Sequence, residues 1–120
     1  MADPDVLVVG AGPAGAAAAI TLARAGRSVT VVDKATFPRD KICGDGLTTG
    51  ALRLLDQLGL EPKAVSSWQQ VDDVVVSSPT GWSATFPLPR DRGTFAAVAR
   101  RMDLDAALLD VARDAGAEVL

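Results

Sequence analysis

The stretch VLVVGAGPAGAAAAITLARAGRSVTVVD, residues 6–33, decides the fold. Residues 5–9 form a short apolar run, which predicts a strand buried on both faces, as in a parallel sheet. Residues 14–25 are rich in alanine, the strongest helix former, and they predict a helix that ends at Gly26. Residues 29–32 form a second apolar strand. The stretch therefore predicts a βαβ unit with parallel strands and a right-handed crossover.

The turn between the first strand and the helix has the spacing G-x-G-x-x-G, formed by Gly10, Gly12 and Gly15. Gly10 allows a tight turn, Gly12 lets a pyrophosphate approach the backbone, and Gly15 lets the helix pack closely on the strands. Pro13 suits the first helical position, where an N–H group is not needed. The free amides and the positive end of the helix dipole would face the phosphates. The competing interpretation is a tight turn without a ligand.

Asp33 ends the second strand and lies 18 residues after Gly15. At this place an acid accepts hydrogen bonds from the ribose of an adenosine, and its charge would repel a 2′-phosphate. The competing interpretation is an acid that only begins a loop. Both NAD and FAD carry an ADP moiety, so this spacing does not choose between the two cofactors.

The rest of the chain extends the βαβ unit into a larger α/β domain. We expect a loop over 34–45, a helix over 47–58, a hairpin around residues 79–81, a short strand over 95–99, a helix over 103–115 and a third parallel strand over 117–120. The fold class is thus a Rossmann-like α/β domain with a β-rich insertion. We divide it into a nucleotide-binding unit (1–65), an insertion toward a second domain (66–100) and a return segment (101–120). Because the chain stops as a strand begins, we interpret it as a truncated N-terminal portion.

The composition excludes several classes of function. The net charge is −3 and the pI is about 4.7, which argues against nucleic acid as a partner. The chain has no histidine and one cysteine, so we predict no metal site. No apolar stretch is long enough to span a bilayer, and the N-terminus lacks the basic region of a secretory signal. We expect a cytoplasmic protein.

Three motifs together resemble FAD-dependent oxidoreductases of the geranylgeranyl reductase family, which have a p-hydroxybenzoate hydroxylase-like fold. They are VVGAGPAG (8–15), PRDKICGDGL (38–47) and ARRMDLDAALLDVARDAGAEV (99–119). The resemblance implies FAD as the cofactor. It also implies that the family's more usual Glu is replaced by the shorter Asp33.

The resemblance further implies which residues contact the cofactor. The pyrophosphate would lie at Gly10, Gly12, Pro13, Ala14 and Gly15, the adenosine ribose at Asp33, the adenine end at Lys34 and Val119, the flavin side at Cys43, Gly44 and Gly46, and the ribityl-pyrophosphate section at Arg101. No catalytic residue is assigned.

The resemblance implies a reductase that uses reduced FAD to add hydride to a carbon–carbon double bond of an isoprenoid chain. The substrate would be a small molecule, such as a prenyl lipid reached by peripheral membrane contact, and NAD(P)H would be the external electron donor. Two alternatives stay open: an FAD-dependent hydroxylase or halogenase, and a non-catalytic ADP-binding module.

Several charged and reactive side chains have more than one interpretation. Cys43 has three interpretations: a side chain that packs against the cofactor, a redox group or proton donor, or a plain buried thiol. Arg39 and Lys41 either lie in a solvated loop, which we favour, or attract an anionic substrate headgroup. We expect Asp103 and Asp105 to lie at a helix start, where acids complement the dipole.

Overall fold

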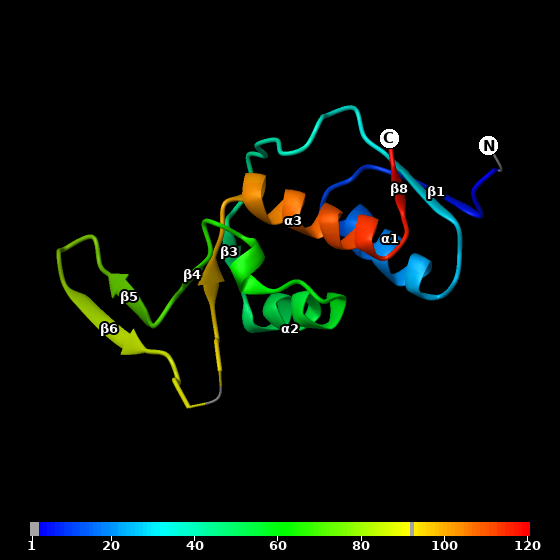
Figure 1. Cartoon of the computed structure of the whole chain (residues 1–120). Coiled ribbons are helices and arrows are strands. Elements are labelled where there is room, and N and C mark those ends of the chain that lie inside the picture. Colours follow the sequence, from blue (N-terminus) through cyan, green and yellow to red (C-terminus); the bar gives the residue numbers. More distant parts are fainter. Residues whose placement is uncertain (1–2, 92) are drawn as a thin grey trace.

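The computed structural model describes residues 3–91 and 93–120, and Figure 1 shows their arrangement. A parallel sheet has the order β1-β2-β8, formed by β1 (Val6–Val9), β2 (Val29–Val32) and β8 (Glu118–Val119). Helix α1 (Pro13–Arg24) connects the first two strands. The predicted βαβ unit and the third parallel strand are therefore confirmed, and the chain is a mixed α/β fold.

Helix α3 (Arg101–Asp114) packs beside α1, as Figure 1 shows. The close approach follows from the small side chains of α1, since Ala16 and Ala19 are fully buried. The helix predicted over 103–115 is thus present as α3. Its buried side chains include Leu104, Leu108, Leu109 and Ala112, because α3 has neighbours on more than one side.

Strand β1 differs from the prediction of a strand buried on both faces. Val6 and Val8 are half-buried, whereas Leu7 is 57% and Val9 is 80% exposed. Helix α1 packs on one face of this strand, and none of the described residues forms a layer on the other. The central strand β2 fits the prediction better, with Val29 and Val31 buried.

The second helix begins later than predicted. Gly46–Leu47 form a short strand, β3, and helix α2 covers Thr49–Leu58. Thr48 stops the helix from starting earlier, because it is extended and its Oγ1 accepts a 3.3 Å hydrogen bond from the amide of Ala51. The helix ends at Leu58, as predicted, and Gly59 follows it in the left-handed conformation. A short 3₁₀ turn over Pro62–Ala64 follows.

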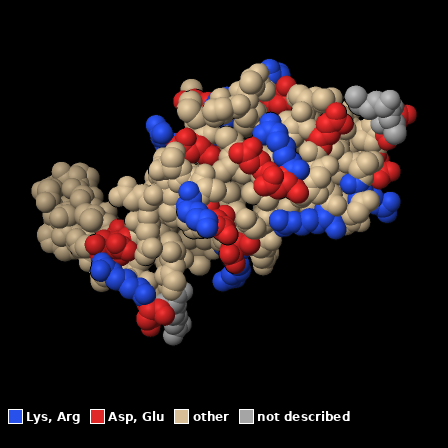
Figure 2. Space-filling view, viewed as in Figure 1, with Lys and Arg blue, Asp and Glu red and all other residues tan. Residues whose placement is uncertain are grey.

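The insertion contributes two small antiparallel sheets. Strand β7 (Ala97–Val98) pairs with β3 on one side and with β4 (Gln69–Gln70) on the other. Strands β5 (Asp73–Ser77) and β6 (Ser83–Pro87) form the predicted hairpin, which projects away from the helices in Figure 1. Its far end shows no charged side chain in Figure 2.

Candidate functional site

The glycine loop between β1 and α1 has the conformation that its spacing predicts. Gly10 lies in the left-handed region, with φ of 104°, and its amide bonds the carbonyl of Val32 at 2.8 Å. A Cβ on Gly15 would collide with the carbonyl of Gly10 and would lie 3.3 Å from Cγ1 of Val8. Gly10 therefore shapes the turn, and Gly15 permits contact between α1 and the end of β1.

Helix α1 presents an uncapped N-terminus at this loop. Gly12 is the N-cap residue, and no side chain of the described residues caps the first turn. Helix α2, in contrast, has the side-chain cap from Thr48. The amides of Ala14 and Gly15 and the positive end of the α1 dipole are therefore available to an anion. Pro13 occupies the first helical position without leaving a donor unused.

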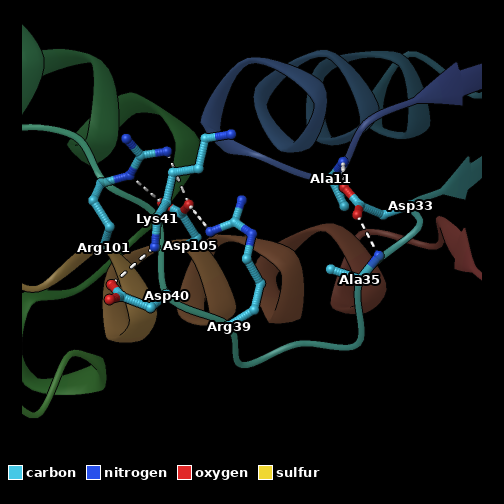
Figure 3. A network of polar contacts seen from close by, with 8 residues as sticks. All are labelled: Ala11, Asp33, Ala35, Arg39, Asp40, Lys41, Arg101 and Asp105. Atoms are coloured by element: carbon cyan, nitrogen blue, oxygen red, sulfur yellow. Dashed lines mark hydrogen bonds and ion pairs between the residues drawn. The ribbon is translucent and has the colours of Figure 1, made fainter.

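Asp33 is bound to the glycine loop rather than directed only into solvent. Its Oδ2 accepts a 2.8 Å hydrogen bond from the amide of Ala11, and its Oδ1 accepts a 2.7 Å bond from the amide of Ala35. Figure 3 shows both bonds. They are the main cause of the lowered pKa of Asp33, so the group is ionised at neutral pH. Each oxygen keeps a further lone pair that a ribose hydroxyl can use.

The predicted adenosine end forms one shallow site. Asp33, Lys34 and Val119 line a common cavity of about 200 Å³, together with Ala11. These residues come from three segments that are far apart in the sequence, and the parallel order of β1, β2 and β8 brings them together. Its lining mixes apolar side chains with the polar groups of Lys34, Thr36 and Arg113, and the carboxylate of Asp33 lies at the end of a strand, where an adenosine ribose can reach it.

Of the residues predicted to lie beside the flavin, which are Cys43, Gly44 and Gly46, only Gly44 lines a cavity next to the start of α1. Gly44 and Arg101 line an apolar cavity of about 370 Å³ with Pro13 and Ala14. Gly46 does not line this cavity, because it belongs to β3 and pairs with Val98.

Cys43 is exposed, so the interpretation as a buried thiol is wrong. It lies near enough to Arg101 to add to the raised pKa of that guanidinium. Its contact with the cofactor stays a prediction.

Arg101 is part of an ion-pair cluster that sequence reasoning missed. Its Nε and Nη2 lie 2.9 and 3.0 Å from the two carboxylate oxygens of Asp105. The Nη1 of Arg39 lies 2.7 Å from Oδ2 of the same carboxylate. Figure 3 shows Arg39 reaching α3 from the loop after β2. The carboxylate raises the pKa of Arg101, so its guanidinium stays charged.

This cluster corrects two expectations. The side chain of Arg39 is only 19% exposed and that of Asp105 is fully buried, so Arg39 is not solvated, whereas Lys41 in the same loop is exposed as expected. Asp103 does lie in the first turn of α3, but Asp105 serves as a shared ion-pair partner rather than as a dipole-complementing acid. The spacing of four residues from Arg101 to Asp105 was the available sequence signal.

The arrangement fits a dinucleotide whose diphosphate crosses the start of α1. One end of the site offers Asp33 and Val119 to an adenosine, and the other offers Gly44 and Arg101. Gly12 has an open approach, since a Cβ there would meet only Nη2 of Arg39, at 3.7 Å. Within residues 3–91 and 93–120, no cluster of acidic, cysteine or histidine side chains could hold a metal ion, and no helix is long and apolar enough to cross a membrane.

Comparison with known proteins agrees with this geometry. The family described as "FAD binding domain" matches residues 3–119. The chain is 49% identical to a menaquinone reductase of Mycobacterium tuberculosis over 117 residues, which are 97% of this chain and 28% of that protein. The chain thus spans little more than a quarter of the length of this relative.

Two solved structures resemble the chain closely. The flavin-dependent brominase Bmp2 superposes with a TM-score of 0.78 and 28% identity, over 98% of this chain and 29% of that one. A geranylgeranyl bacteriochlorophyll reductase-like protein of Thermoplasma acidophilum superposes with a TM-score of 0.74 and 28% identity, over 97% of this chain and 29% of that one. The glycine loop, the acid after β2 and these similarities agree on one cofactor, FAD, and the chain belongs to the FAD binding domain family.

Proposed function

We propose that the protein to which this chain belongs is a flavin-dependent reductase of the geranylgeranyl reductase family, and that it reduces a carbon–carbon double bond in an isoprenoid chain. The main support is the 49% identity to a menaquinone reductase over nearly the whole chain. Menaquinone carries a polyprenyl tail beside its quinone ring. The similarity to a geranylgeranyl reductase-like structure also favours a prenyl substrate.

The residues of this chain would hold and orient the cofactor. The uncapped start of α1 would hold the diphosphate, and Asp33 would hold the adenosine ribose. The insertion, residues 66–100, would extend toward a substrate domain. Reduced FAD supplies a hydride when it is bound, with NAD(P)H as the external donor. A prenyl-lipid substrate would bring a cytoplasmic enzyme of this type into contact with the membrane surface.

The brominase similarity favours a second candidate, an FAD-dependent halogenase or hydroxylase. The two structural neighbours have the same identity to this chain, so the superpositions do not choose between them. The Cys-Gly-Asp-Gly segment beginning at Cys43 is the feature on which we favour a reductase. A third candidate, a non-catalytic ADP-binding module, would bind FAD without turnover.

The test is to incubate the full-length gene product with FAD, NADPH and menaquinone without oxygen, and then to expose the product to air before mass spectrometry. Reduction of the tail adds two hydrogen atoms that persist in air, whereas a reduced quinone ring reoxidises. We expect a mass increase of two hydrogen atoms that persists in air, and an unchanged quinone absorbance after reoxidation. A mass increase that is lost in air would show that the quinone ring, and not the tail, is reduced.

A parallel reaction with oxygen and bromide tests the second candidate. A brominated or hydroxylated product would replace the proposal with a halogenase or hydroxylase. Bound FAD without any product in either reaction would favour the non-catalytic module.

A further inference from the structure

Arg39 lies beside the glycine loop, and its ion pair with Asp105 uses only one of its two terminal nitrogens. Its Nη1 bonds the buried carboxylate at 2.7 Å, while its Nη2 lies 3.7 Å from the place that a Cβ on Gly12 would occupy. Among the described residues, none accepts a hydrogen bond from Nη2. One side of the guanidinium is therefore fixed to α3, and the other borders the open space before the start of α1.

Two contacts fix the position of this guanidinium, and the bonds from Arg101 fix the carboxylate to which it is paired. The carboxylate of Asp105 is fully buried, so it cannot exchange the arginine for water. The bonds from Arg101 hold the same carboxylate from a second side. The ring of Phe37 lies 4.4 Å from Cζ of Arg39, which is within the range of a cation–π contact. Arg39 thus has little freedom to turn away from Gly12.

The charge balance of the cluster favours an anion at this place. Arg39 and Arg101 share the single carboxylate of Asp105, so these three side chains keep a net charge of +1, which the nearby Asp33 carboxylate offsets in part. Only 19% of the Arg39 side chain and 14% of the Arg101 side chain is exposed, so solvent screens this charge less than at the open surface. The amides at the start of α1 add their partial positive charge from the opposite side.

We propose that Arg39 is a specific ligand of the FAD diphosphate and that Asp105 is the residue that positions it. A guanidinium donates to phosphate over about 2.7–2.9 Å. Because Nη2 lies only 3.7 Å from the Cβ place of Gly12, a phosphate oxygen in van der Waals contact with the Gly12 backbone can also come within hydrogen-bonding distance of Nη2. The diphosphate is then held between the amides of α1 and Nη2 of Arg39. This inference rests on FAD binding and is independent of the substrate proposed above.

The test measures FAD affinity and its dependence on salt in the full-length protein after removal of the bound cofactor. We expect Arg39→Met to weaken FAD binding about tenfold to a hundredfold, the effect of losing one charge-assisted hydrogen bond. We also expect affinity for FAD to fall less with rising salt in this variant than in the wild type, since an attractive charge has been removed. Arg39→Lys keeps the charge but not the planar fork, so it should recover part of the affinity.

The matched control is Arg90→Met, which changes the net charge equally. Arg90 lies in the exposed loop after β6 and pairs with Asp73 at 3.5 Å. Its replacement should change neither the affinity nor the salt dependence. An Arg39→Met protein with wild-type affinity would overturn the proposal, and so would a loss of affinity with an unchanged salt dependence, because that result would show a purely structural role.

Arg39→Lys also provides a readout that does not depend on affinity. We expect the ³¹P resonances of its bound FAD to differ from those of the wild type, because the donor at the diphosphate has changed. Unchanged ³¹P resonances would overturn the proposal even if Arg39→Met failed to fold. None of these outcomes depends on turnover, so a failure of the proposed reductase activity would be seen separately.

Discussion

The amide of Ala11 donates a 2.8 Å hydrogen bond to the Oδ2 of Asp33, and this bond joins the glycine loop after β1 to the end of β2. The second oxygen, Oδ1, accepts the amide of Ala35 at 2.7 Å. An acid at this position therefore has a structural role in addition to the predicted contact with a ribose. Because backbone amides bind the charged form, the pKa of Asp33 lies below its ordinary value of 3.8.

The first prediction concerns Asp33→Asn. A neutral amide side chain cannot accept both backbone bonds as a carboxylate does, so we expect a loss of about 1–2 kcal/mol in the free energy of unfolding at pH 7. The wild-type contribution is complete above the unfolded pKa near 3.8 and is lost as the pH falls through the lower folded pKa. The difference between variant and wild type should therefore shrink below pH 3.8. Urea unfolding of the full-length apoprotein across pH 2–7 measures it.

The control for this experiment is Asp3→Asn, which removes an exposed acid outside the site. It should leave the free energy of unfolding nearly unchanged at every pH. A difference between Asp33→Asn and wild type that stayed constant down to pH 2 would contradict the role assigned to the ionised carboxylate.

The parts of the fold and site that local sequence determines could be predicted. A left-handed Gly10, a tightly packed Gly15 and an acid after β2 depend on residues within one βαβ unit, whose spacing is nearly fixed. The hairpin could also be predicted, because Gly81 adopts φ of 90° between two β-branched segments.

The features that were missed depend on contacts between distant segments. Arg39 and Asp105 are 66 residues apart, and only the packing of α3 beside the loop after β2 brings them together. An acid near the start of a helix is usually solvent-exposed, so its burial could not be read from α3 alone. The exposure of Leu7 and Val9 was missed for a related reason. An apolar strand pattern predicts that both faces of the strand are covered, but none of the described residues covers the second face of β1.

The second prediction compares alanine at two glycines of the same loop. A Cβ on Gly12 meets only Nη2 of Arg39, at 3.7 Å, which is an ordinary contact. We therefore expect Gly12→Ala to keep the thermal stability of the apoprotein but to weaken FAD binding, because the methyl group occupies the approach to the amides. A Cβ on Gly15 would collide with the carbonyl of Gly10. We expect Gly15→Ala to destabilise the apoprotein itself, by about 1–3 kcal/mol.

Thermal unfolding and FAD titration of the two variants separate these effects, and Gly12→Val extends the series with a branched side chain that should abolish flavin uptake. Equal loss of apoprotein stability in Gly12→Ala and Gly15→Ala would argue against an open approach at Gly12. Unchanged flavin absorbance in purified Gly12→Val would contradict the placement of the diphosphate at this residue.

The third prediction separates two roles of Cys43. Its thiol is exposed in the described chain, so a thiol-alkylating reagent should modify it readily in the apoprotein. If Cys43 packs against the cofactor, bound FAD will slow this modification at least several-fold, and Cys43→Ala will retain both FAD and turnover. Cys43 is the only cysteine of these 120 residues, so peptide mass spectrometry can follow its modification by position even if the full-length protein has other thiols. Alkylation at the same rate with and without FAD would remove the predicted contact, and loss of turnover in a Cys43→Ala protein that still binds FAD would assign the thiol a chemical role.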